Sequence, residues 1–224
     1  MRYAPSVFER ERMGKKKFVK EYVEPIVVAI LIALFVRTFI VQAFKIPSSS
    51  MEPTLLVGDH LLVNKFSYGT RIPYSDKILG ESKKFFEWKK PKRGDVIVFI
   101  FPKDREKDFI KRVIAVEGEK VEVVGNKIKI NDRLIEDPWG VYSDRNAWAR
   151  YFPAMERYGP VVVPKDSLFV MGDNRDNSQD SRFWGFVDIK DVKGKALVIY
   201  VSWNSIASDF IHKVRWERIG MLIH

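Results

Sequence analysis

Residues 96–116 read VIVFIFPKDREKDFIKRVIAV and contain two apolar runs on either side of a polar turn. The first run, Val96 to Phe101, and the second, Ile110 to Val116, are short and rich in β-branched and aromatic residues. Runs of this length and composition favour β-strands. The stretch therefore predicts two strands, and the second of them contains a lysine, Lys111.

Similar short runs recur after residue 44 and are separated by turn residues. They lie at 61–63, 121–124, 128–130, 161–163, 168–171 and 196–201. Glycine followed by a short polar residue stands between many of them, as at Gly58-Asp59, Gly94-Asp95 and Gly125-Asn126, and such pairs mark turns. No long segment after residue 44 shows the 3.6-residue apolar period of a helix. The predicted fold class is mainly β, with an antiparallel sandwich or barrel-like core.

The composition is that of a globular chain and excludes several kinds of site. The 224 residues are 46% hydrophobic and 30% charged. There is no cysteine, which excludes disulfides and thiolate metal sites. A three-histidine metal site would need all of His60, His212 and the C-terminal His224, so we expect no metal and no cofactor. The formal charge of +10 suits nucleic acid or anionic lipid. Because no DNA-binding motif is visible, we expect membrane lipid and no nucleic acid.

An apolar segment near the N-terminus predicts a membrane anchor. Residues 23–43 are long enough to cross a bilayer, which takes about 20 residues, provided that Arg37 reaches the headgroups. Basic side chains are concentrated in residues 1–22, which predicts a cytoplasmic N-terminus and an exported C-terminal part. The alternatives are a buried core helix and a cleaved signal peptide ending at Val41-Gln42-Ala43. The basic leader is long for a signal peptide, so we favour a single-pass type II anchor.

Ser50, in the segment PSSSMEPTL just past the anchor, is a candidate nucleophile. A serine hydroxyl needs a base to remove its proton. Lys111 can be that base if apolar neighbours lower its pKa. In a regular strand, Phe109, Val113 and Ala115 would share the face of Lys111 and supply those neighbours.

Two other interpretations of these residues stay open. The Lys111 stem can lie along a sheet while its ammonium reaches water, and the residue then has no chemical role. A Ser-His-Asp triad through His60 is the other alternative, although no motif surrounds that histidine.

The segment from Gly172 to Gly185, GDNRDNSQDSRFWG, is dense in short polar residues. Such residues hydrogen-bond within their own loop. A calcium loop would need a glycine at its sixth position and a glutamate at its twelfth, and both are missing. The apolar end of the segment is unlike plain surface. We therefore expect a polar network beside a site, with carboxylates paired to Arg112, Arg175 or Arg182.

Four segments match, in order, the sequence boxes of the type I signal (leader) peptidases. They are Pro47 to Leu55, Arg93 to Phe99, Asp108 to Val113 and Gly172 to Trp184. The chain resembles that family from the anchor to its C-terminal end. Its members are membrane-anchored serine endopeptidases that use a Ser/Lys dyad to remove signal peptides from exported preproteins. The resemblance implies the same activity for this chain.

The resemblance also implies catalytic roles for the matching residues. Ser50 would attack the scissile carbonyl, and Lys111 would act as general base. The Ser50 N–H and the Ser48 hydroxyl would form the oxyanion hole. Ser178 would hydrogen-bond and orient Lys111.

Other matching residues would support the dyad or bind substrate. The bracing pairs implied by the resemblance are Asp180 with Arg182 and Asp173 with Arg112. Shallow apolar pockets for small substrate residues, usually alanine, would be lined by Phe44, Ile46, Leu55, Phe109 and Ile110. Ser49 stands where many members have glycine and Phe109 where many have tyrosine, which leaves the fine specificity open.

The resemblance further implies a domain organisation and a location. Residues 44–116 and 169–224 would form the antiparallel β catalytic domain, and residues 117–168 a smaller inserted β cap. The protein would be a monomer in the bacterial cytoplasmic (inner) membrane, with this domain on the exterior or periplasmic side. An anchor ending near Ala43 would leave about six residues before Ser50, which reach about 20 Å when fully extended.

Two rival hypotheses make different predictions. A self-cleaving repressor-type Ser/Lys protease would have an N-terminal DNA-binding helical domain, and no such pattern is visible here. A non-catalytic, membrane-anchored β scaffold would keep its function when Ser50 or Lys111 is replaced.

Overall fold

The described part of the N-terminal unit is one long apolar helix. The computed structural model describes residues 19–72, 75–142, 157–207 and 213–224, so most of the basic leader expected at 1–22 lies outside the described residues. The turns η1 (Val19–Val23) and η2 (Val36–Ile40) extend α2 (Glu24–Phe35) at its two ends. Together they give a helix over Lys20–Ile40 that is long and apolar enough to cross a membrane.

The helix ends at Ile40 and not at the expected Ala43. Val41–Lys45 forms strand β1, which pairs antiparallel with β2 (Asp59–Asn64) from Val41 opposite Asn64 to Lys45 opposite His60. Residues 41–43, which were expected to continue the helix, therefore form backbone hydrogen bonds with β2 instead. The residues divide into two compact units at this point, Met1–Ile40 and Val41–His224.

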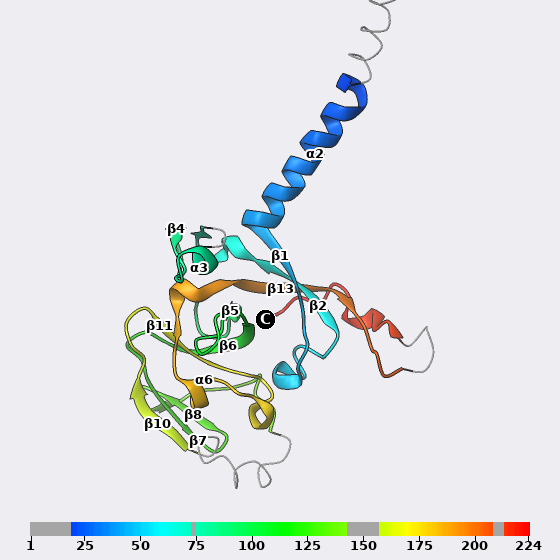
Figure 1. Ribbon diagram of the computed structural model, residues 1–224. Helices are drawn as coiled ribbons and strands as arrows, with labels where there is room; N and C mark the ends of the chain where they lie inside the picture. Colours follow the sequence, from blue (N-terminus) through cyan, green and yellow to red (C-terminus); the bar gives the residue numbers. More distant parts are fainter. Residues whose placement is uncertain (1–18, 73–74, 143–156, 208–212) are drawn as a thin grey trace, which may run out of the picture. The chain divides into compact units, whose positions relative to one another are not determined.

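The second unit is built on a seven-stranded sheet, which confirms the mainly β, antiparallel prediction (Figure 1). Its strand order is β1-β2-β13-β5-β6-β11-β12. The strands not yet bounded are β5 (Val96–Ile100), β6 (Asp108–Val116), β11 (Ser167–Met171), β12 (Val187–Asp188) and β13 (Val192–Ser202). The two runs of residues 96–116 are the neighbouring strands β5 and β6, which pair antiparallel with Ile97 opposite Lys111.

A β-bulge interrupts the pairing of β6 with β11. Val113 lies opposite Val170 and Ala115 opposite Phe169, so Ile114 has no partner in β11. The expected alternation of faces along β6 consequently ends at this point. Val113 packs in one core cluster, whereas Ile114 and Ala115 pack together in another. The prediction that Ala115 shares the face of Lys111 is therefore wrong.

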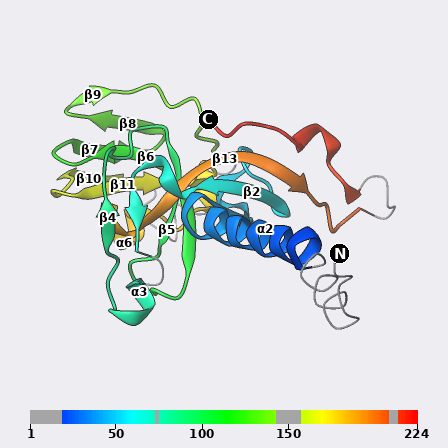
Figure 2. The same ribbon diagram turned by 90° about the horizontal axis from the view of Figure 1, so that it is seen from above.

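A second sheet of four strands lies beside the first and has the order β10-β7-β8-β9 (Figure 2). Its strands are β7 (Lys120–Val124), β8 (Lys127–Ile130), β9 (Arg133–Leu134) and β10 (Arg157–Val162). These strands fall within the residues expected to form a cap, 117–168. Ser167 and Leu168 already belong to β11 of the larger sheet, where they pair with Asp188 and Val187.

A small excursion leaves the large sheet after β2. The turn η4 (Lys65–Ser67) leads into β3 (Thr70–Arg71), the short helix α3 (Ser75–Ile78) and β4 (Lys84–Phe86), and β3 pairs with β4. Its base is fixed to the core because Ser82 Oγ and the Arg105 guanidinium both donate to the buried carboxylate of Asp191.

Candidate active site

The nucleophile candidate lies on a tight turn that is pressed against the end of β11. Ser50 is in η3 (Ser49–Met51), and its carbonyl accepts a hydrogen bond from Asn174 N at 3.2 Å. Gly172 makes this approach possible, because a Cβ there would come within 2.3 Å of both Ser50 O and Ser178 Oγ. Only glycine allows the two backbones to lie so close.

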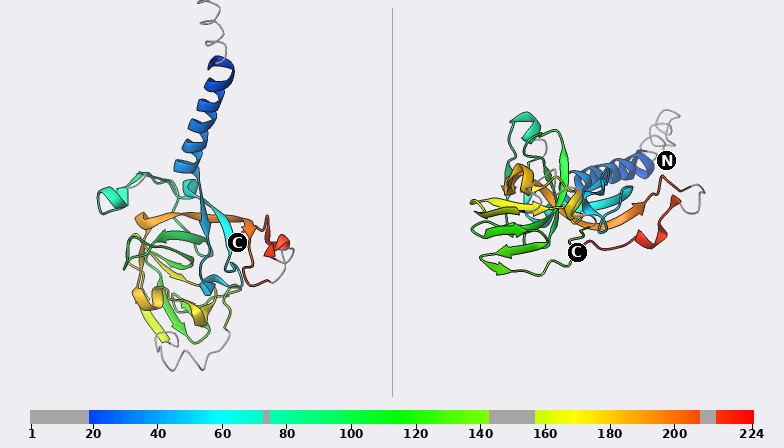
Figure 3. Two further views of the ribbon diagram at one scale, coloured as in Figure 1. Left: turned by 45° about the vertical axis from the view of Figure 1, so that its right-hand side comes forward. Right: turned by 90° about the horizontal axis from the view of Figure 1, so that it is seen from below.

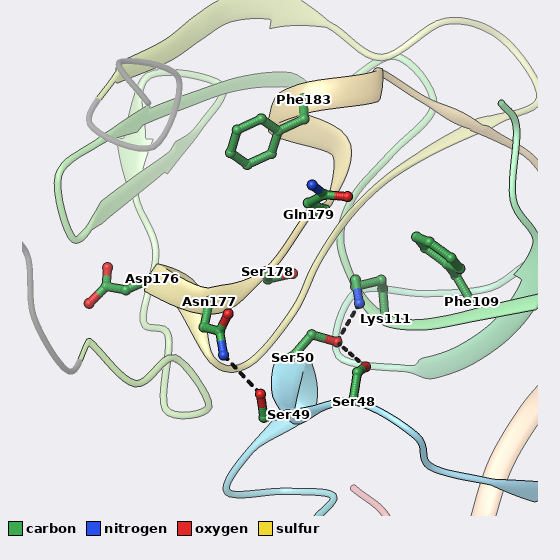
Figure 4. Close-up of a pocket in the computed structure, with 10 residues that line it drawn as sticks. All are labelled: Ser48, Ser49, Ser50, Phe109, Lys111, Asp176, Asn177, Ser178, Gln179 and Phe183. Carbon is green, nitrogen blue, oxygen red and sulfur yellow. Dashed lines mark hydrogen bonds between the residues drawn. The ribbon is translucent and has the colours of Figure 1, made fainter. Parts of the chain in front are cut away.

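Lys111 reaches the serine from β6. Its Nζ donates to Ser50 Oγ at 2.7 Å, and Figure 4 shows the two side chains meeting in one pocket. The pocket has a volume of about 370 Å³. It is lined by Ser48, Ser49, Ser50, Phe109, Lys111, Asp176, Asn177, Ser178, Gln179 and Phe183. η3 and β6 thus bring together two residues that are 61 positions apart.

Burial makes the Lys111 amine easier to deprotonate. Only 4% of this residue is exposed, and the loss of water lowers its pKa to about 8. The Asp180 and Asp173 carboxylates act in the opposite direction and raise the pKa. Burial is the larger effect, so a substantial fraction of the amine is neutral near pH 8. The alternative of a lysine whose head reaches water does not describe this residue.

The Ser48 hydroxyl lies on the other side of Ser50. Ser48 Oγ and Ser50 Oγ are 3.4 Å apart. Ser48 is exposed, whereas Ser50 is only 8% exposed. A substrate oxygen bound between these two hydroxyls would therefore face solvent on the Ser48 side and protein on the Ser50 side.

Two buried ion pairs lie beneath this pocket. Arg112 donates through Nε and Nη2 to the two oxygens of Asp173, at 2.8 and 2.7 Å. Arg182 contacts both oxygens of Asp180 in the same way, each at 2.8 Å. Burial alone would raise the pKa of Asp180, but the Arg182 guanidinium beside it lowers that pKa below its usual range. The Asp180 carboxylate is therefore held as an anion close to Lys111.

Ser178 lines the pocket but does not form the expected hydrogen bond to Lys111. Its hydroxyl is buried and forms no hydrogen bond of normal geometry among the described residues. Lys111 Nζ instead donates to Ser50. The hydroxyl acts on the neighbouring Asp180 carboxylate instead, because it helps to lower the pKa of that group.

Of the five expected pocket residues, only Phe109 lines the pocket. Ile46 and Leu55 are buried in a core cluster, and Phe44 and Ile110 pack against that cluster while remaining partly exposed. Leu55 has no exposed surface, so it cannot contact a substrate directly. Its backbone N–H donates to Met51 O at 2.9 Å, and the two side chains share a core cluster, so Leu55 packs with the turn that carries Ser50.

Several residues near the site carried no signal of their own in the sequence. Thr54 Oγ1 donates to Asp173 at 2.6 Å and so ties the Ser50 turn to the Arg112 pair. Asn177 Nδ2 donates to Ser49 Oγ at 2.8 Å across the pocket rim. Both belong to segments that the sequence singled out, but the bonds depend on the way the segments meet.

His60 lies away from this arrangement. It is on β2, opposite Lys45 of β1 and Val201 of β13. Its ring lies edge-on to the Tyr200 ring, with the two ring centroids 6.0 Å apart. It is not among the residues that line the pocket, so the triad through His60 finds no support.

Comparison with known proteins identifies the family. Residues 19–203 match the family model described as signal peptidase, peptidase S26. A signal peptidase I from Pseudomonas fluorescens is 35% identical, with 97% of this chain and 84% of that protein covered. A signal peptidase I from Aquifex aeolicus is 38% identical, with 75% of this chain and 79% of that protein covered. A crystal structure of a signal peptidase I from Enterococcus faecalis is 31% identical and has a TM-score of 0.40 over 48% of this chain and 97% of that one. The chain therefore belongs to the signal peptidase I family, the serine peptidases of family S26 that remove signal peptides.

Proposed function

We propose that this protein cuts signal peptides from preproteins with Ser50 as nucleophile and Lys111 as general base. The observation that carries the proposal is the 2.7 Å hydrogen bond between Lys111 Nζ and Ser50 Oγ in a pocket where burial lowers the pKa of the lysine. A neutral amine at this distance can accept the hydroxyl proton.

The steps follow from this geometry. Lys111 takes the proton of Ser50 Oγ while the oxygen attacks the carbonyl carbon before the scissile bond. The oxyanion that forms accepts hydrogen bonds from the Ser50 N–H and the Ser48 hydroxyl. The Lys111 ammonium then gives its proton to the departing amine, and a water activated by Lys111 releases the acyl group. Loss of one oxyanion donor typically slows such reactions by about 10²–10³, and we expect this for Ser48→Ala.

Small residues such as alanine before the cut fit the shallow site. Phe109 forms one wall of the pocket, and the remaining apolar residues expected there lie in or against the core behind it. Asp173 and Asp180, with Arg112 and Arg182, would fix the floor. We further propose that helix Lys20–Ile40 anchors a type II protein in the bacterial cytoplasmic membrane, with the β domain outside.

The test is cleavage of a preprotein with an Ala-x-Ala site by full-length protein and by Ser50→Ala and Lys111→Ala. Ser167→Ala and Lys190→Ala are matched controls on exposed hydrogen bonds and ion pairs away from the pocket. We expect the wild type and both controls to cut after the second alanine and the two site variants to be inactive while folded. Near wild-type activity of Lys111→Ala would remove the lysine from the mechanism.

A further inference from the structure

The chain that leaves the smaller sheet runs to the catalytic loop, and the catalytic proposal does not use it. We call residues 137–142 the strap. They follow β9 and the residue Ile135, whose N–H still donates to Ile128 O of β8 at 3.0 Å. Figures 2 and 3 show the chain leaving β9 and running toward the C-terminus. The strap then lies against residues 172–175, which directly follow β11.

Backbone hydrogen bonds join the strap to this loop. Val141 forms a parallel bridge with Asn174, in which Val141 N donates to Asp173 O at 2.8 Å and Arg175 N donates to Val141 O at 2.9 Å. Successive N–H groups of an extended chain point to opposite sides, and the Asn174 N–H donates to Ser50 O on the other side. The loop is therefore held between the strap and the turn of the nucleophile.

A buried ion pair fixes the strap to the same loop. Asp137 accepts from Nη1 of Arg175, and from its Nη2 at 2.8 Å, and the two side chains are 10% and 0% exposed. Arg175 in turn donates through Nε to Gly172 O at 3.0 Å, and its carbonyl accepts from Arg182 Nη2 at 2.7 Å. A Cβ at Gly140 would come within 2.5 Å of both Arg175 Nη1 and Asp137 Oδ2, so the strap closes tightly around this pair.

The Trp139 ring covers a second arginine. The guanidinium carbon of Arg112 lies over this ring, 4.5 Å from its centroid, and tryptophan is the aromatic side chain that attracts a cation most strongly. Arg112 is fully buried and binds both oxygens of Asp173. Its Nη1 also donates to Gly94 O at 2.7 Å, and a Cβ at Gly94 would come within 3.2 Å of the Trp139 ring. The strap thus closes one face of the guanidinium that holds Asp173.

We propose that the strap is a positioning element of the active site and that Asp137 and Trp139 are its positioning residues. They hold Arg175 and Arg112, and through them the loop on which the Ser50 turn rests. The proposal rests on the Ser/Lys mechanism proposed above. It gives the smaller sheet a part in catalysis, although no strap residue is among the described residues that line the pocket.

The first test replaces the ring over Arg112 in the full-length protein. Trp139 is only half-buried, so its replacement should leave the fold intact. In cleavage of a soluble Ala-x-Ala peptide, Trp139→Leu should lower kcat at least about tenfold, because small displacements of reacting groups slow catalysis strongly. KM should stay within about twofold of the wild-type value, since the strap does not line the pocket. Trp139→Phe keeps an aromatic face over the cation and should retain kcat to within about threefold.

The second test removes the charge that Arg175 binds. Asp137→Asn should likewise lower kcat at least about tenfold at nearly constant KM, because the buried guanidinium loses its carboxylate. Asp132→Asn is the matched control, since Asp132 forms an exposed pair with Lys120 next to the same sheet. Trp88→Leu is the control for the ring, because Trp88 is 48% exposed on the excursion after β2. Both controls should keep the wild-type kcat.

Melting temperatures are measured for all variants, and cleavage is assayed well below the lowest of them. Wild-type kcat in folded Trp139→Leu and Asp137→Asn overturns the proposal. Equal losses in Trp139→Leu and Trp139→Phe also overturn it, because the ring would then act by packing alone, and so does a loss confined to KM. If Asp137→Asn does not fold, the comparison of the two Trp139 variants decides.

Ser50→Ala and Lys111→Ala in the same assay separate this proposal from the catalytic one. If these two variants are inactive while the strap variants keep the wild-type kcat, the strap proposal fails and the Ser/Lys proposal stands. If Lys111→Ala stays active, the Ser/Lys proposal fails, while the comparison of Trp139→Leu with Trp139→Phe still decides whether the strap supports the Ser50 turn.

Discussion

Lys111 is an amine that is only 4% exposed, and its protonation should govern the pH dependence of the enzyme. Its pKa is lowered to about 8, and only the neutral amine can act as a base. Below pH 8 the active fraction should rise about tenfold for each pH unit, and above pH 8 it should level off.

The measurement is kcat/KM for a soluble peptide between pH 5.5 and 10, with the substrate free of groups that titrate in that range. An apparent pKa near the ordinary histidine value of about 6.5, or near the ordinary lysine value of about 10.4, would contradict this prediction.

Asp180 offers a way to move that pH profile. Its charge raises the pKa of Lys111, so Asp180→Asn should move the rise in kcat/KM below pH 8. The same change leaves the buried Arg182 without its partner, which typically destabilises a fold by about 3–5 kcal/mol. Asp188→Asn, on an exposed pair with Lys190, is the control and should leave the profile unchanged. If the apparent pKa of kcat/KM stays near 8 in folded Asp180→Asn, this carboxylate does not influence the pKa of Lys111.

At the same scale, the sequence led to Ser50 and Lys111 but not to every contact around them. The resemblance placed Arg112 with Asp173 and Arg182 with Asp180, and these pairs are present. It did not predict that Ser178 lacks a bond to Lys111, because a hydroxyl's partner is set by distances of a few tenths of an ångström. It also did not predict that Leu55 faces the core, because burial depends on strands distant in the sequence.

Among the elements, the junction between η3 and the end of β11 should be the least tolerant of change. A Cβ at Gly172 would meet Ser50 O and Ser178 Oγ. Gly172→Ala should therefore displace the nucleophile and lower kcat by at least about 10²-fold, a loss that displacements of about 1 Å can cause. It should also lower the melting temperature.

Gly118→Ala is the control for that change. Its φ of +78° makes an alanine there strained, but a Cβ would meet no atom within 4 Å. It should cost about 1 kcal/mol of stability and leave kcat unchanged. If Gly172→Ala behaves like this control in both activity and melting temperature, the contact is looser than the geometry indicates.

The strands themselves were predictable because their signal is local. The runs at 96–101 and 110–116 are the strands β5 and β6, since β-branched and aromatic composition is read from neighbouring residues. The end of the helix and the bulge at Ile114 were not predictable. Each depends on pairing with a distant strand, β2 in one case and β11 in the other.

For the whole molecule, the length of chain between helix and nucleophile differs from the expectation. The helix ends at Ile40, so residues 41–49 precede Ser50 and reach at most about 35 Å. Confinement to a membrane surface raises the effective concentration of enzyme around an embedded substrate.

A version beginning at Val41 should therefore cut a soluble peptide normally but process a vesicle-inserted preprotein more slowly than the full-length enzyme. A version beginning at Phe44 should be less stable, because it lacks the pairs of Val41, Gln42 and Ala43 with β2. Melting temperatures and the two cleavage rates check both statements. Equal processing of the inserted preprotein by the Val41 version would rule out a kinetic benefit of the anchor.

The bulge at Ile114 in β6 also restricts which insertions and deletions this strand can tolerate during evolution. Because side chains alternate along a strand, one residue more or fewer reverses every side chain beyond the change. With Ile114 present, Lys111 meets Ser50 while Ile114 and Ala115 pack in the core near the smaller sheet. A one-residue deletion between them would turn one of these groups outward. Descendants of this sequence can substitute residues here, but they should conserve the number of residues between Lys111 and Ala115.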